Sequence, residues 1–396
     1  MCTGRFSLSK FLVKVNCILN KNKKIKTKKK IVFIFIDKSY AVYHAISLAM
    51  QCASDDNFEV TIACSIQNYG LVKKYAASYQ IDIKVLRPYW YIALPHYLEI
   101  KLQFRKLLFK KYRNYFNSFD LFICTLYEDI LLRQELNSEK DKHFISCNHG
   151  VSNTSYSFDD KIKAFDLFYI SGQDEYTIRQ EKNQLTASNH ALIGYLKYEL
   201  LKDVETENVF SNNKKTVLYN PHWRKDKSSF FKFGFEILDY FAKSETYNLI
   251  FAPHSLLGVR NKNLLLKINS YKKYNNIHID YGSEKCNDFT YVKEADIYLG
   301  DVSSQALEFL LFGYRPCLFL DAFDIVRKNK DQVISWELGQ VIDSIKEFES
   351  SLKDCYVNHA STYKKIQEER IPKMFYQGDK LPSILAKDAI LNLIKD

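Results

Sequence analysis

The residues best suited to chemistry lie in one short stretch, where Asp301, Ser303 and Ser304 follow an apolar run and precede a helix-like pattern. Both serines are good N-cap residues, and the first backbone N–H groups of a helix have no partner within it. The helix dipole adds positive charge there, worth roughly 0.3–1 kcal/mol to a nearby anion. The stretch therefore indicates either a phosphate-binding turn, with Glu308 placed to accept a bond from a ribose hydroxyl, or a plain cap on a buried helix.

Three histidines and an arginine follow other apolar runs of the sequence. His149 ends one run, His222 and Arg224 follow a second, and His254 follows a third. Ligands of open parallel sheets bind at the carboxyl ends of the strands. If two halves of the chain face each other, these groups meet in the cleft between them, where arginine, histidine and a helix N-terminus suit a diphosphate. Each residue taken singly is also consistent with a structural role.

The apolar pattern predicts the elements that position these residues. Expected strands lie at 30–36, 58–64, 81–86, 120–125, 143–150, 166–171, 190–193, 216–220, 248–254, 277–281, 296–299, 317–320 and 336–342. Expected helices lie at 40–52, 69–79, 95–116, 174–182, 230–241, 264–271, 288–294, 304–312, 345–352 and 381–394, and a further one follows the strand at 120–125 and ends at 136. This alternation predicts an α/β protein with two Rossmann-like domains. A nicotinamide cofactor is not indicated, because no Gly-x-Gly-x-x-Gly follows the first strand.

We divide the 396 residues by composition and pattern. The expected parts are a basic tail at 1–29, a Rossmann-like domain at 30–204, a polar linker at 205–215, a second such domain at 216–380 and a closing helix at 381–396. The net charge of +11 predicts an anionic partner, and the lysines are concentrated in the tail. Because the rest of the chain is nearly balanced, a nucleic-acid-binding protein is disfavoured.

Two segments are candidates for contact with a membrane surface. Residues 6–19 form either an amphipathic surface helix or a disordered basic tail, and the basic pattern at 95–116 is either membrane-facing or a solvated face of a packed helix. The sequence has no apolar run of 18 residues that would span a bilayer. Nine scattered cysteines without a Cys-x-x-Cys pair favour a reducing cytosol over a disulfide scaffold or zinc site.

Five motifs occur in an order that resembles the CDP-glycerol glycerophosphotransferases of teichoic-acid synthesis and their capsule-polymer relatives. They are Asn148-His-Gly-Val-Ser152, Gly194-Tyr-Leu-Lys197, Tyr219-Asn-Pro-His-Trp-Arg224, Ala252-Pro-His-Ser255 and Gly300-Asp-Val-Ser-Ser304. The resemblance implies a GT-B-like fold, in which two Rossmann-like domains face each other across a cleft. The first domain would take the acceptor and the second the nucleotide donor.

The resemblance also implies a reaction, in which an acceptor hydroxyl attacks the phosphorus of a CDP-linked polyol phosphate and CMP leaves. The implied catalytic residues are His149 as general base, with His254 and Asp301. The implied diphosphate ligands are Arg224, His254, Ser303 and Ser304. The implied nucleotide-binding residues are Glu308, Gly194 and Lys197, and further candidates are His222, Asn148 and Gly150. No metal or cofactor is expected, because arginine, histidine and the helix N-terminus already supply positive charge.

The sequence departs from the family pattern in places, so alternative activities remain to be considered. Leu196 stands where the family has proline, and Glu308 where the teichoic-acid enzymes have aspartate. The alternatives are a GT-B glycosyltransferase with a nucleotide-sugar donor and a nucleotide-sugar 2-epimerase. In each transferase reading the acceptor is polymeric or lipid-linked. We expect a cytoplasmic enzyme held peripherally on the inner face of a bacterial membrane, with no nucleic-acid partner.

Overall fold

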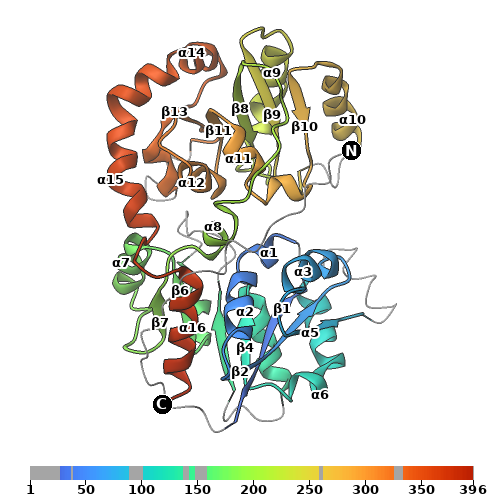
Figure 1. Cartoon of the computed structure of the whole chain (residues 1–396). Coiled ribbons are helices and arrows are strands. Elements are labelled where there is room, and N and C mark those ends of the chain that lie inside the picture. The colour runs from blue at the N-terminus through green and yellow to red at the C-terminus, as the bar shows by residue number, and fades with distance from the viewer. Residues whose placement is uncertain are drawn as a thin grey trace, which may run out of the picture.

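Two parallel β-sheets form the framework of the protein in a computed structural model (Figure 1). The structure describes residues 27–36, 39–88, 101–136, 142–147, 158–257, 262–324 and 333–395. Each sheet is the centre of one α/β domain, so the predicted pair of Rossmann-like domains is confirmed. Among these residues, no helix is both long and apolar enough to cross a membrane.

The sheet of the first domain has the order β3-β2-β1-β4-β5-β6-β7 among the described residues. Its strands are β1 (Lys29–Phe35), β2 (Phe58–Cys64), β3 (Ile81–Val85), β4 (Leu121–Cys124), β5 (His143–Ser146), β6 (Leu167–Ile170) and β7 (His190–Leu192). Its helices are α1 (Tyr40–Tyr43), α2 (Ile46–Ala53), α3 (Tyr69–Ala76), α5 (Lys101–Lys111), α6 (Arg113–Phe116) and α7 (Gln173–Glu181), with 3-10 turns η2 (Tyr127–Glu135) and η4 (Asp160–Ala164). The run from Ile31 to Phe35 is buried throughout, as expected of a central parallel strand covered on both faces.

The sheet of the second domain has the order β10-β9-β8-β11-β12-β13. Its strands are β8 (Lys215–Asn220), β9 (Tyr247–Phe251), β10 (Ile277–Ile279), β11 (Ile297–Gly300), β12 (Cys317–Leu320) and β13 (Gln340–Ile342). Its main helices are α9 (Phe230–Ala242), α10 (Lys262–Asn269), α11 (Thr290–Glu294), α12 (Gln305–Leu310) and α14 (Phe348–Asn358). Helix α9 packs on the sheet because Phe230, Phe233, Ile237 and Phe241 recur at helical spacing on one buried face.

The chain crosses between the domains twice. The short helix α8 (Leu196–Leu201) leads from β7 toward the second domain, and α15 (Lys364–Met374) leads back. The last helix, α16 (Pro382–Leu393), then lies against the first domain (Figure 1). Tyr376 N donates to Ser171 O at 2.7 Å, and Lys387 Nζ bonds to Asp55 Oδ2 at 2.8 Å. The final helix is therefore a structural part of the first domain.

Some predicted elements differ in the structure. Residues 40–52 form two helices broken at His44, and within 336–342 only Gln340–Ile342 is a strand, because Trp336 lies in a 3-10 turn (Ile334–Leu338). The segment 359–374, for which the sequence pattern predicted no element of either kind, continues α14 as a π-turn (His359–Tyr363) and then α15. Of the expected helix at 95–116, residues 101–116 are described and form α5 and α6. The tail at 1–26 lies outside the described residues.

Candidate active site

The candidate site begins where the strand order of the second sheet reverses. Strands β8 and β11 are neighbours, with Asn220 opposite Gly300, although β9 and β10 come between them in sequence. Loops that leave two such strands diverge to opposite sides and open a crevice at the carboxyl edge of the sheet. The loop at 221–229 follows β8 and the turn at 301–304 follows β11, so both lie at this edge of the sheet, where ligands of open parallel sheets bind.

Asp301 joins these two loops. Its Oδ1 accepts a bond from His222 N at 2.8 Å, and its Oδ2 accepts bonds from Ser229 N at 2.6 Å and Ser229 Oγ at 2.8 Å. The residue is fully buried, and this burial raises the pKa of its carboxyl group to about 6, although the bonds favour the charged form. One carboxylate thus holds both ends of the loop at 222–229. The bond to His222 is made to its backbone, not to its imidazole.

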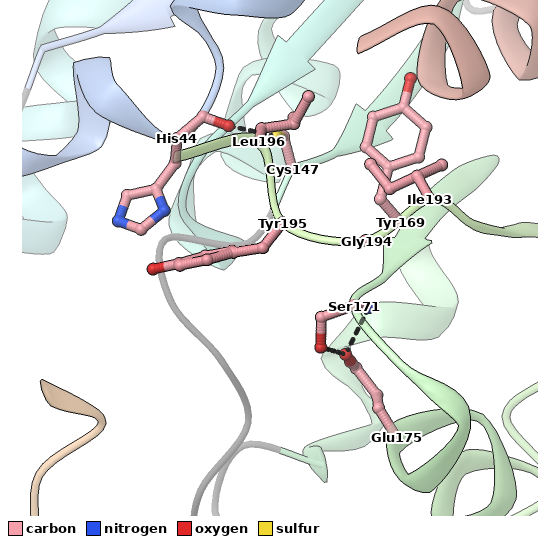
Figure 2. A pocket seen from close by; sticks show the side chains of 9 residues that line it. All are labelled: His44, Cys147, Tyr169, Ser171, Glu175, Ile193, Gly194, Tyr195 and Leu196. Atoms are coloured by element: carbon pink, nitrogen blue, oxygen red, sulfur yellow. Dashed lines mark hydrogen bonds between the residues drawn. The ribbon is translucent and has the colours of Figure 1, made fainter. Parts of the chain in front are cut away.

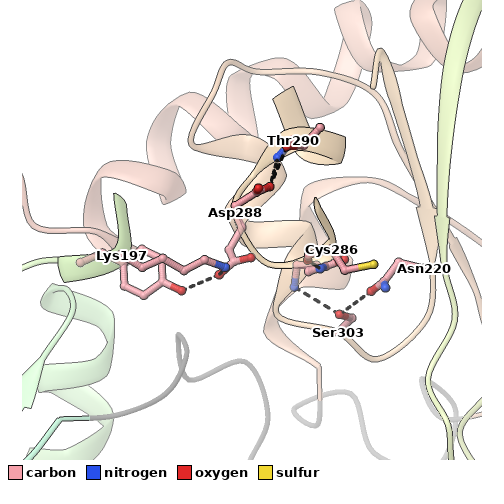
Figure 3. Close-up of polar contacts among 9 residues, drawn as sticks. Lys197, Asn220, Cys286, Asp288, Thr290 and Ser303 are labelled. Carbon is pink, nitrogen blue, oxygen red and sulfur yellow. Dashed lines mark hydrogen bonds and ion pairs between the residues drawn. The ribbon is translucent and has the colours of Figure 1, made fainter. Parts of the chain in front are cut away.

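The two serines lie at the start of α12. Ser303 Oγ donates to Asn220 Oδ1 at 2.8 Å and accepts from Gln305 N at 3.2 Å (Figure 3). Ser304 is the N-cap residue by position, but its side chain makes no capping bond. Ser303 therefore caps the helix and ties it to β8. The hydroxyl of half-buried Ser304 adjoins the same turn.

Three aromatic rings cluster beside this turn. The ring of His222 stacks on Trp223 with centroids 5.8 Å apart, and His254 lies 5.8 Å from His222. His222 Nδ1 accepts from Arg224 N at 3.0 Å, and His254 Nδ1 accepts from Leu256 N at 3.2 Å. In a neutral imidazole the ring proton is then on Nε2, which can donate to a phosphate oxygen. Burial, together with Lys227 and Arg224, lowers the pKa of His222 to about 4, so this ring is neutral near pH 7.

Arg224 is exposed and paired within its own loop. Its Nε and Nη2 bond to the two carboxylate oxygens of Asp226 at 3.0 and 2.7 Å. A surface ion pair of this kind contributes only about 0–1 kcal/mol. An incoming diphosphate can therefore compete with Asp226 for the guanidinium at small cost.

Glu308 lies one turn into α12 and contacts the other domain. Its Oε1 accepts bonds from Lys197 Nζ at 2.8 Å and from Tyr195 OH at 2.5 Å. The structure thus brings together Glu308 and Lys197, which the sequence motifs only implied. Tyr195 stands within the second of these motifs, and its role became visible only through this contact.

Gly194, predicted to be a nucleotide-binding residue, has a backbone role in the structure. Its φ of +91° lies in the region that favours glycine, and an added Cβ would lie 2.6 Å from Tyr376 O. The glycine allows the chain to turn sharply from β7 toward α8, with the C-terminal segment packed against it. It therefore sets the position of Lys197.

Asn148, His149 and Gly150 lie outside the described residues. The chain is described as far as Cys147, which follows β5 and whose Sγ donates to His44 O at 3.0 Å. Next to it is a cavity of about 30 Å³, lined by the ends of β5, β6 and β7 and by His44 (Figure 2). At its wall, Ser171 N and Oγ donate to Glu175 Oε2 at 3.0 and 2.9 Å. Single-sequence patterns gave no reason to single out His44 or Glu175.

No group of three or more His, Cys, Asp or Glu side chains suited to a metal ion occurs in the described part of the chain. The cationic groups near the crevice belong instead to the loop at 222–229. Arg224, Lys225 and Lys227 lie in this loop, and Arg224 and Lys227 contribute to the lowered pKa of His222. The arrangement can bind an anion through side-chain N–H donors and serine hydroxyls.

The sequence profile of one protein family, described as CDP-Glycerol:Poly(glycerophosphate) glycerophosphotransferase, matches residues 139–383. The chain belongs to this family. The match spans both crossings and all of the second sheet, and it includes each of the five motifs. The protein is therefore a transferase of the glycerophosphotransferase type. No curated protein matches the chain.

Three solved structures of similar fold contain CDPG, UDP or UDP-glucose. The wall teichoic acid polymerase TagF with CDPG has a TM-score of 0.58 at 14% identity, over 92% of this chain and 90% of that one. MnaA of S. aureus with UDP has a TM-score of 0.61 at 13% identity, over 93% and 98%. Anabaena HepE with UDP-glucose has a TM-score of 0.54 at 12% identity, over 93% and 100%. These likenesses confirm the GT-B-like fold.

Proposed function

We propose that this enzyme moves a glycerol-phosphate, or a related polyol-phosphate, from a CDP-linked donor to a hydroxyl of a growing envelope polymer. The polymer would be a capsule, a teichoic-acid-like chain or a lipopolysaccharide. The observation that carries the proposal is the clasp of Asp301, which holds the basic loop at 222–229 against the serine turn at 303–304. Membership of the glycerophosphotransferase family supports a CDP-linked donor.

The diphosphate of the donor would lie between this loop and this turn. We assign its oxygens to Arg224, His254 and the hydroxyls of Ser303 and Ser304, with Nε2 of His222 as a further donor. Helix α12 has only six residues, so side-chain and backbone donors carry more of the binding than its dipole does. Removing one pre-aligned donor of this kind typically costs about 3 kcal/mol in the transition state.

The reaction is a phosphoryl transfer with a single bond exchange. The acceptor oxygen forms a bond to the phosphorus that carries the polyol, the bond from this phosphorus to the bridging oxygen breaks, and CMP leaves with that electron pair. We assign the removal of the acceptor proton to His149, because an imidazole with a pKa near 6.5 suits a base at neutral pH. Asp301 would act by holding the donor loops, and Glu308 by binding the ribose.

The decisive experiment is an assay of CMP release by the purified enzyme. CDP-glycerol, CDP-ribitol and common nucleotide sugars are offered with a polymer acceptor, and we expect CMP from a CDP-polyol. His149→Asn should lower kcat by roughly a hundredfold or more. His143→Asn, at the amino end of the same strand β5, is the matched control and should keep its rate. Wild-type turnover by His149→Asn would remove the base assignment.

A glycosyltransferase of the same fold is the second candidate, because HepE with UDP-glucose shares the fold. The two reactions differ in the leaving group. Attack on phosphorus releases CMP, whereas attack on the anomeric carbon of most nucleotide sugars releases a nucleoside diphosphate. Release of a nucleoside diphosphate from a sugar donor, with no turnover of CDP-polyols, would replace the first proposal with the second.

A peripheral position on an anionic membrane surface is part of the proposal. In α5, Arg105 is buried and bonds to Asp129 at 3.1 Å, so one face of this helix packs inward. The other side of α5 is exposed and carries Lys106, Leu107 and Lys110; Leu107 is 38% accessible. Together with the basic tail they suit anionic lipid. Removing residues 1–26 should weaken sedimentation with phosphatidylserine vesicles at low salt, and equal sedimentation would exclude a role of the tail.

A further inference from the structure

Two residues of the crossing segment hold Glu308 from the other domain. Lys197 Nζ and Tyr195 OH both donate to its Oε1, at 2.8 and 2.5 Å. Lys197, Glu308 and Tyr195 are only 3%, 5% and 7% exposed. The ammonium group also lies 4.4 Å from the centre of the Phe289 ring. Removing one partner of a buried ion pair leaves the other charge uncompensated. The Lys197 and Glu308 side chains therefore keep each other in this arrangement.

We propose that Lys197 and Tyr195 are positioning residues for recognition of the donor ribose. A carboxylate has two oxygens and about four acceptor positions. Both donors converge on Oε1, which fixes the rotation of the group and directs Oε2 to a ribose hydroxyl. The inference rests on the proposed function, which assigns Glu308 to the ribose.

The physical gain is preorganisation. A free glutamate must give up rotamer freedom when it binds a ligand, and this loss of entropy weakens the binding. Here the ion pair, the tyrosine hydroxyl and the Phe289 ring have already restricted Glu308. The ammonium group also keeps the carboxylate paired at a site that water scarcely reaches.

The arrangement couples ribose recognition to the contact between the domains. Lys197 and Tyr195 belong to the segment anchored by Gly194 on the first domain, whereas Glu308 belongs to the second. The contacts of Asp301 and Ser303, in contrast, lie within the second domain. Loss of the Lys197 contact should therefore weaken selection of the ribose hydroxyls more than binding of the diphosphate.

The test compares the affinity of the full-length protein for CDP with its affinity for 2′,3′-dideoxy-CDP by calorimetry. A hydrogen bond to a charged group contributes about 1.5–3 kcal/mol, so wild type should bind CDP at least about tenfold more tightly. Glu308→Gln should reduce this ratio strongly. Lys197→Met and the milder Tyr195→Phe should each reduce it several-fold, and their effects should largely disappear when Glu308→Gln is also present.

Glu199→Gln is the matched control on the same helix. Glu199 bonds to Ser383 N and Oγ, so its substitution disturbs α8 and α16 without touching Glu308. It should keep the wild-type ratio, and thermal unfolding of each variant shows that it is folded. A wild-type ratio in both Lys197→Met and Tyr195→Phe, with a reduced ratio in Glu308→Gln, would overturn the inference. Absence of CDP binding to wild type would instead overturn the proposed function.

Discussion

Substitution of Asp301 by asparagine tests how the donor site is held together. Asparagine has nearly the same shape but only one acceptor oxygen. The wild-type carboxylate accepts from His222 N on one side and from Ser229 N and Oγ on the other. The amide nitrogen of the variant must face one of these donors, and a buried donor left without an acceptor costs about 1–3 kcal/mol.

The loss of stability caused by Asp301→Asn depends on pH, because Asp301 titrates. Burial raises the pKa of Asp301 from 3.8 in the unfolded chain to about 6 in the folded protein. Between these values the folded state binds a proton that the unfolded state has released. The free energy of unfolding of the wild type therefore falls as the pH rises through this window. From pH 5 to pH 8 the contribution of Asp301 to the free energy of unfolding falls by about 1.4 kcal/mol. The full difference between the two pKa values corresponds to about 3 kcal/mol.

Asparagine does not titrate, so the variant lacks this dependence. At pH 8, relief from burying a charge offsets part of the lost bonding, and the variant should be only mildly destabilised. At pH 5, its deficit relative to wild type should be larger by about 1.4 kcal/mol. Urea unfolding followed by circular dichroism measures the difference in the free energy of unfolding between wild type and variant at each pH. CDP affinity at pH 8 reports separately whether the loop at 222–229 is still in place.

Asp296→Asn is the matched control. Asp296 lies at the amino end of β11, away from the crevice, and its oxygens bond to Lys215 Nζ at 2.7 Å and Thr216 N at 2.9 Å. This variant should lose stability but keep its affinity for CDP. If the deficit of Asp301→Asn is the same at both pH values, or larger at pH 8, the hydrogen bonds outweigh burial and the raised pKa is refuted.

Two further predictions follow from single contacts. Gly194→Ala should lower the free energy of unfolding by more than about 1 kcal/mol, because its φ is +91° and its Cβ would lie 2.6 Å from Tyr376 O; an unchanged urea midpoint would show that the turn can relax. Asp226→Asn should tighten CDP binding at low salt by up to about fivefold, because it releases the Arg224 guanidinium from a surface pair. A weaker affinity in calorimetry would mean that Asp226 holds Arg224 in its binding position.

Local pattern was sufficient to predict the element that carries the serine turn. The run at 296–299, the glycine after it and the leucines beyond Ser304 predicted strand, turn and helix, and the structure has β11, α12 and β12 in these places. The sequence order of strands also predicted two Rossmann-like domains. Both predictions rest on local sequence. A strand buried on both faces is a continuous apolar run, and a helix that packs on a sheet has apolar residues at helical spacing.

Contacts between residues that are far apart in the sequence could not be predicted from local pattern. Asp301 looks like an ordinary turn residue in the sequence, yet its partners lie 79 and 72 positions away. Lys197 and Glu308 are 111 positions apart. The apolar run that includes Trp336 suggested a strand, but its indole Nε1 donates to Asp301 O at 3.1 Å from a 3-10 turn. Tertiary hydrogen bonding overrode the local pattern there.

Helix α15 shows a related difficulty. Its sequence is mostly charged and contains Pro372, so the apolar period is weak. The helix is held instead by a fully buried polar residue, Gln367, whose Nε2 donates to Arg315 O at 3.0 Å and Leu338 O at 2.7 Å. A buried amide that satisfies two carbonyl groups cannot be distinguished by sequence from one that faces solvent.

The two halves of the donor site are stabilised by different parts of the molecule, and this difference has a measurable consequence. The diphosphate region is built by Asp301 and Ser303, whose bonds remain within the second domain. The ribose carboxylate is fixed by Lys197, which comes from the crossing segment. Pyrophosphate contains only the first of these determinants, so Lys197→Met should leave its affinity unchanged while CDP affinity falls. Asp301→Asn should weaken both ligands, because the loop at 222–229 serves the group that they share. Equal losses of both ligands in Lys197→Met would show that the contact between the domains shapes the whole crevice rather than its ribose end alone.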